Sequence, residues 1–136
     1  MFSKLDLNSF YIIGVLTREQ ADLLCSKSIK IKFSVDNLLK NILEHPEFDI
    51  KDYKNISEYI NSADYILKKN NKNLIYFKIN NQIYQIVVKC TQDYNELFIT
   101  TFHIASRKQL NKDIIRYENI KKDSSDYEDS NYPSVT

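Results

Sequence analysis

Apolar residues along the chain follow two different periods, and each period predicts a different kind of element. Near the N-terminus, residues 9–16 form a β-branched apolar run that is typical of a strand. Thr17 and Gln20 follow with the spacing of a capping box, in which one side chain caps the first turn of a helix. The pattern therefore predicts a strand followed by a helix over about 18–28.

The next apolar pattern repeats with the period of a helix that begins at Ser34. Its apolar stripe consists of Val35, Leu38, Leu39 and Ile42. Pro46 ends this helix, because the residue before a proline is pushed out of the α region. His45 is therefore predicted to lie at the helix end.

After a further helical stretch over about 55–62, the apolar period changes to that of strands. Strands are predicted over residues 63–68, 74–80, 83–91 and 96–104. Asn80 and Asn81 can adopt the positive φ angles that a tight hairpin turn needs. A last helical spacing is formed by Leu110, Ile114 and Tyr117.

These elements predict one α+β domain over residues 1–120. We expect the N-terminal strand and the helices to pack on one face of a C-terminal antiparallel β-sheet. Residues 121–136 have almost no aliphatic side chains and are predicted to form a disordered polar tail. No internal repeat and no second domain is indicated.

Alternation divides the three clearest strands into two faces, because successive side chains point to opposite sides of a sheet. The face predicted to pack on the helices carries Ile75, Phe77, Ile79, Tyr84, Ile86, Val88, Cys90, Phe98, Phe102 and Ile104. The opposite face is predicted to carry Tyr76, Lys78, Gln85, Lys89, Thr101 and His103. A polar face of this kind is commonly just solvated. Lysines can also hold phosphate and imidazole can exchange a proton near neutral pH, so the same face is a candidate active site.

Composition limits the classes of function. The 136 residues include 19 basic and 18 acidic side chains, a net charge of +1, so bulk charge does not favour a duplex-binding protein. Any contact with nucleic acid then depends on a local cluster. Cys25 and Cys90 match no zinc or CxxC pattern, and we expect buried thiols in a reducing cytoplasm in preference to a disulfide. No segment reaches the roughly 18 apolar residues of a membrane span, so no membrane association is expected.

The familiar catalytic motifs are absent from the sequence. It contains no Gly-rich phosphate loop, no nucleophile elbow and no HExxH pair, so neither a cofactor nor a metal is expected. His45 and His103 are the only histidines. A structural role is the simpler interpretation of a histidine at a helix end, whereas His103 lies among polar neighbours and is as readily a catalytic group.

Six segments of the chain occur in a distinctive order. They are YIIGVLT (11–17), EHPEF (44–48), SADYIL (62–67), LIYFK (74–78), YQIVVK (84–89) and LFITTFHI (97–104). Together they cover about 11–110, and their order resembles the phage-associated branch of the barnase–EndoU–colicin–RelE-like nuclease superfamily.

The resemblance implies a RelE/barnase-like fold and RNA cleavage by metal-independent transesterification, often by a toxin or effector of a phage or mobile element. It also implies an active face that contains His45, Lys78, Thr101 and Lys89. The chain departs from the family pattern at 62–63, where Ser-Ala stands in place of Asn-Pro. It also has only Asn41 where a second histidine is expected, one turn before the histidine of EHPEF.

The leading hypothesis is a small cytoplasmic ribonuclease that binds RNA on the polar face of the sheet. In it, His103 and His45 act as acid and base, Lys78 and Lys89 hold phosphate, Thr101 donates a hydrogen bond, and Tyr76 and Gln85 bind substrate. One alternative is a non-catalytic module of the same fold that binds RNA or a protein, such as an antitoxin, an immunity protein or a host factor. Another is an accessory protein of a phage or plasmid particle.

Overall fold

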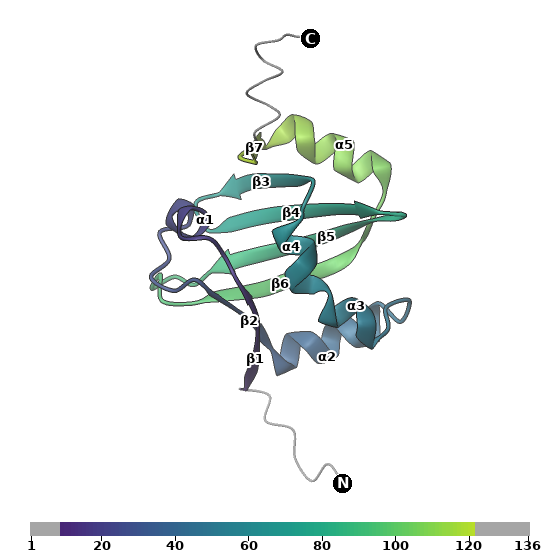
Figure 1. Cartoon of the computed structure of the whole chain (residues 1–136), viewed down its shortest axis with the longest axis horizontal. Coiled ribbons are helices and arrows are strands. Elements are labelled where there is room, and N and C mark those ends of the chain that lie inside the picture. The colour runs from purple at the N-terminus through teal and green to yellow at the C-terminus, as the bar shows by residue number, and fades with distance from the viewer. Residues whose placement is uncertain (1–8, 122–136) are drawn as a thin grey trace, which may run out of the picture.

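A seven-stranded sheet forms the centre of the computed structural model, which describes residues 9–121 (Figure 1). The strands are β1 (Phe10–Val15), β2 (Lys30–Ser34), β3 (Tyr65–Asn70), β4 (Asn73–Asn80), β5 (Gln82–Cys90), β6 (Leu97–Ala105) and β7 (Glu118–Asn119). Their order across the sheet is β1-β2-β6-β5-β4-β3-β7. Only β2 and β6 pair in parallel; the other neighbours within these residues are antiparallel.

Helix starts follow the capping signals in the sequence. The helices are α1 (Arg18–Leu23), α2 (Val35–Glu44), α3 (Ile50–Lys54), α4 (Ile56–Asn61) and α5 (Arg107–Arg116). The hydroxyls of Thr17, Ser34 and Ser106 each accept a hydrogen bond from a backbone N–H in the first turn that follows. Helix α1 ends earlier than predicted, and Cys25 just beyond it has a φ of 56°. Strand β2 was not predicted. Helix α2 begins directly after it with Ser34 as its N-cap, in agreement with the predicted helix start at Ser34.

Helices cover both faces of the sheet, not one. Helix α4 crosses in front of the strands in Figure 1 and packs against β1, β4 and β5. It comes so close to β1 that a Cβ added to Gly14 would lie 2.7 Å from Ser57 Oγ. On the opposite face, Leu110 of α5 packs with Leu67, Ile75 and Phe77 of β3 and β4. We call the first the α4 face and the second the α5 face.

The predicted face assignment is wrong for β4. Lys78 pairs with Tyr84 and Asn80 pairs with Gln82, so Asn81, with a φ of 65°, is the only residue between the paired ends. The two-residue turn assumed from the sequence would have shifted this register by one. Because such a slip moves every side chain of a strand to the other face, Ile75, Phe77 and Ile79 lie on the α5 face. Tyr76 and Lys78 lie on the α4 face instead.

The predicted face of Phe98 is also wrong, because β6 contains a β-bulge. Val87 pairs with Thr101 but Val88 pairs with Ile99, so Thr100 is an extra residue in β6. The bulge reverses the alternation of β6, and Phe98, which was predicted to be part of the core, lies on the α5 face opposite Lys89.

The cysteines and the apolar stripe of α2 differ in part from the prediction. Cys90 is buried as expected, but Cys25 is exposed, and neither forms a disulfide. Ile42, assigned to the apolar stripe of α2, is exposed, whereas Asn41 is buried. In residues 9–121 no helix is both long and apolar enough to cross a membrane. The predicted tail lies outside the described residues, apart from Lys121.

The corrected register can be tested by a pair of stability measurements. Tyr76 is fully buried, and its hydroxyl donates to Gln20 Oε1 at 2.8 Å. Replacing a large buried aromatic residue by Ala costs about 3–5 kcal/mol, so Tyr76→Ala should lower the free energy of unfolding by that amount. Lys89→Ala, at an exposed position, should change it by less than about 0.5 kcal/mol. Urea denaturation measures both, and a small loss for Tyr76→Ala would restore the register assumed from the sequence.

Candidate active site

The site forms where one edge of β6 has no neighbouring strand among residues 9–121. Strand β2 pairs with β6 only through Ile31–Leu97 and Lys32–Phe98; its last two residues pair with β1 alone, and α2 begins directly after them. The segment that follows α2 packs against this part of β6. Phe48 of this segment stacks on Phe102 of β6, with ring centroids 4.3 Å apart and an angle of 12° between the rings. This stack anchors the end of α2 against β6.

The anchored segment brings the two histidines of the chain together. His45 is the C-terminal cap residue of α2, and His103 lies on β6. Their ring centroids are 5.8 Å apart, and the rings meet edge to face at 72°. Both imidazoles are partly exposed, so solvent and ligands can reach them.

Gln85 of β5 orients the His103 ring. The two residues are direct partners in the β5–β6 pairing, and His103 Nε2 donates to Gln85 Oε1 at 2.7 Å. Gln85 is buried, and a buried amide oxygen needs such a donor. This hydrogen bond places the proton of neutral His103 on Nε2 and leaves the lone pair of Nδ1 as an acceptor.

The surroundings of His103 favour its neutral form. Burial lowers the pKa of His103 below its ordinary value, and a positive charge on His45 lowers the pKa further. The carboxylate of Glu47 acts in the opposite direction with a smaller effect. A neutral imidazole with a free lone pair is able to accept a proton at neutral pH.

Glu47 contacts the other histidine directly. Its Oε2 lies 3.3 Å from His45 Nδ1, and the carboxylate forms an ion pair with His45 when that ring is protonated. The contact engages Nδ1 and leaves Nε2 for a ligand. The site therefore contains two imidazoles held by different partners, an amide for His103 and a carboxylate for His45.

Of the other residues proposed from sequence, Thr101 and Lys89 share the α5 face with His103. Thr101 is two positions before His103 on β6 and is half-buried. Lys89 is exposed but lies four positions from Gln85 on β5, about 13 Å along the strand. Thr101 is thus a neighbour of His103, and Lys89 lies at a distance from it.

Lys78 and Tyr76 do not lie on the face of His103. The Lys78 ammonium donates to the backbone carbonyl of Ser62 at 3.0 Å, beside the end of α4. Burial raises the pKa of the Tyr76 phenol far above its ordinary value, and the side chain has no exposed surface on which a base could stack. Neither residue therefore belongs to this histidine site.

Sequence reasoning did not identify Glu47 and Phe48 as parts of the site. Both belong to the EHPEF segment, in which Pro46 ends the helix and turns the chain toward β6. The signal that could have identified them is their position, because an acidic and an aromatic residue directly follow the His-Pro pair that ends the helix.

No group of three or more His, Cys, Asp or Glu side chains in the described residues has an arrangement that could hold a metal ion. No curated protein and no solved structure matches the chain. A family model does match, over residues 12–112, and its description is phage-Barnase-EndoU-ColicinE5/D-RelE like nuclease3. The chain belongs to this nuclease family. The match confirms the resemblance; it begins within β1, ends within α5 and includes His45 and His103.

The lowered pKa of His103 predicts how stability depends on pH in this family member. The unfolded state, with an ordinary histidine pKa of about 6.5, takes up a proton before the folded state does. The contribution of neutral His103 to the free energy of unfolding is therefore fully present above about pH 6.5. As the pH falls from there through the lower pKa of the folded state, the free energy of unfolding should decrease. Urea denaturation of the wild type and of His103→Gln isolates this contribution, and NMR titration of the imidazole measures the pKa. A wild-type His103 pKa above 6.5 would contradict the prediction.

Proposed function

We propose that this member of the phage nuclease family is an RNA endonuclease that uses His45 and His103 as its acid–base pair. The 2′-hydroxyl of a nucleotide would attack the adjacent phosphorus atom, and the bond to the 5′-oxygen of the next nucleotide would break. The products are a 2′,3′-cyclic phosphate and a free 5′-hydroxyl. The observation that carries this proposal is the 5.8 Å approach of the only two histidines in the chain.

His103 is suited to be the general base. Its lowered pKa keeps it neutral near pH 7, and the hydrogen bond to Gln85 leaves Nδ1 free to accept the proton of the 2′-hydroxyl. Gln85 is a positioning residue, because it acts only through the ring that it holds. A base held in one orientation loses little freedom when the reaction begins.

His45 is suited to be the general acid. Its Nε2 has no hydrogen-bond partner among the described residues, while the Glu47 carboxylate contacts Nδ1. Protonated His45 would stabilise the negative charge that develops on the phosphate and then donate its proton to the departing 5′-oxygen. The Thr101 hydroxyl, on the same face, is placed to donate a hydrogen bond to a phosphate oxygen.

The biological setting that fits this activity is a toxin or effector of a phage or mobile element, acting on cytoplasmic RNA. A nuclease of this kind needs an antitoxin or immunity protein in its host cell, which is the partner class we propose. One observation favours the alternative of a non-catalytic binding module. Asn41 replaces the second histidine expected in the family, and its amide donates to Tyr53 Oη at 3.0 Å in a buried contact.

Cleavage of a labelled single-stranded RNA tests the proposal. His45→Ala and His103→Ala should each lower the cleavage rate by about 10²–10⁴-fold, the typical contribution of a positioned acid or base. Their melting temperatures and circular dichroism spectra show whether the fold is intact. Detection of a 2′,3′-cyclic phosphate and the resistance of a 2′-deoxy substrate would identify the attacking group. The assay is run over pH 5–8, in EDTA and in magnesium.

Two lysine variants provide the controls for this assay. Lys112→Ala removes an exposed charge on α5, away from the histidines, and should cleave like the wild type. Lys78→Ala removes an ammonium group that contacts Ser62 on the α4 face and should cleave nearly as well. A severe loss for Lys78→Ala with an intact fold would favour the site predicted from sequence over the histidine site. A wild-type protein that cleaves no RNA under any of these conditions would overturn the nuclease proposal.

A further inference from the structure

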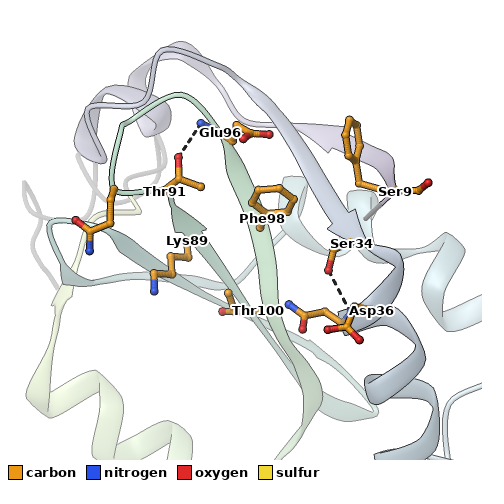
Figure 2. Close-up of a pocket in the computed structure, with 11 residues that line it drawn as sticks. Ser9, Ser34, Asp36, Lys89, Thr91, Glu96, Phe98 and Thr100 are labelled. Carbon is orange, nitrogen blue, oxygen red and sulfur yellow. Dashed lines mark hydrogen bonds between the residues drawn. The ribbon is translucent and has the colours of Figure 1, made fainter. Parts of the chain in front are cut away.

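The α5 face remains open beyond the histidine site. Helix α5 covers β3 and β4, but the strip that runs from His103 past Thr101 and Val87 to Lys89 and Phe98 is only half-buried or exposed. At the far end of this strip is a cavity of about 700 Å³. Its wall is built from β1, the end of β2, the first turn of α2, β5, β6 and the loop between β5 and β6. Figure 2 shows Phe98 in the middle of this cavity, with Lys89 and Thr91 on one side and Ser34 and Asp36 on the other.

The cavity offers an aromatic surface next to a fixed positive charge. Lys32 Nζ lies 4.1 Å from the ring centroid of Phe10 and 5.9 Å from that of Phe98, so one ammonium group contacts both rings. An ion pair of 2.7 Å with Glu96 holds this ammonium group in place. Phe10 is exposed and Phe98 is half-buried, which leaves ring surface for a flat ligand.

The remaining charges at the cavity are largely compensated within the protein. Asp36 pairs with Lys40 at 3.4 Å, and Glu96 pairs with Lys32. Lys89 has no ion-pair partner among the described residues and stands at the end nearest the strip. The net effect is one positive charge at the cavity that no acidic side chain in the described residues compensates.

Polar groups in the wall are available to a ligand. The side-chain amides of Asn37 and Gln92 line the cavity and make no hydrogen bond within the part of the chain described. An amide can donate and accept at the same time, as the edge of a nucleobase requires. Aromatic surface, free amides and a lone ammonium group are the combination that binds an unpaired base and its phosphate.

We propose that this cavity is a binding subsite for an unpaired base of the RNA substrate, with Phe98 as the stacking surface and Lys89 as the phosphate contact. The proposal rests on the proposed function, because it takes the histidine pair as the point of cleavage. The register places Phe98 about 13 Å from His103. The base in the cavity therefore belongs to a nucleotide beyond those joined by the scissile phosphate, and substrates longer than a dinucleotide gain affinity.

Binding of 2′-O-methyl oligonucleotides, which lack the attacking hydroxyl, tests the subsite without cleavage. Fluorescence anisotropy should show that a labelled hexanucleotide binds the wild type much more tightly than a dinucleotide does. Phe98→Ala should weaken hexanucleotide binding by roughly 10-fold or more, the usual effect of losing one stacked base. Phe98→Tyr keeps the ring and should bind like the wild type. Lys89→Ala should reduce the salt dependence of binding by about 0.7 in log–log slope, and Lys112→Ala should leave it unchanged.

A cross-linking measurement on the wild-type protein covers the case in which Phe98→Ala does not fold. A hexanucleotide with 4-thiouridine two nucleotides from its central phosphate should cross-link to peptides that contain residues 34–37 or 89–100. Cross-links elsewhere only, or a hexanucleotide that binds no better than a dinucleotide, would overturn the subsite. These outcomes can be distinguished from a failure of the proposed function. If the wild type cleaves RNA but Phe98→Ala binds the hexanucleotide as tightly as the wild type does, only the subsite is overturned. Length-dependent binding that is lost in Phe98→Ala, without any cleavage, keeps the subsite and removes the nuclease.

Discussion

The stack of Phe48 on Phe102 is the contact on which the histidine site depends. Strand β2 pairs with only two residues of β6, so in the described part of the chain no strand lies beside the C-terminal half of β6. Phe48 packs against this half of β6 through Phe102, and its ring also lies 6.0 Å from Tyr53 and 6.1 Å from Tyr84. Aromatic pairs contribute about 0.5–1.5 kcal/mol beyond the area that they bury. His45 is only three residues from Phe48, so these contacts also determine where its imidazole lies.

Local signals predicted the elements well, but they could not predict the faces. The cap at Thr17, the helix start at Ser34 and the helix end before Pro46 depend on signals within one turn of the chain, and the structure confirms them. Alternation specifies which residues of one strand share a face, but not how two strands are aligned. The single-residue turn at Asn81 and the extra Thr100 each shift the alignment by one. These two positions account for the misplacement of Tyr76, Lys78 and Phe98.

The same reasoning explains which parts of the candidate site could be anticipated. Gln85 and His103 were predicted on one face, and the structure pairs them directly, because the bulge lies beyond them on the other side of Thr101. The approach of His45 could not be predicted, since periodicity places a residue at a helix end without saying where that end docks. Phe98 was assigned to the core, so the cavity around it has no counterpart in the sequence-based prediction. Long-range packing, not local propensity, determines these features.

The state of His103 bears on the choice between a nuclease and a binding module of the same fold. A solvated histidine would bind an RNA phosphate best as a cation with an ordinary or raised pKa. Here burial and the nearby His45 both act against that charge, and they reduce stability at low pH. A binding surface gains nothing from this arrangement, whereas a general base must be unprotonated near neutral pH. Groups whose protonation is shifted at some expense of stability are typical of functional sites. The neutral form that burial and His45 favour in His103 is thus the form that the proposed proton transfer requires.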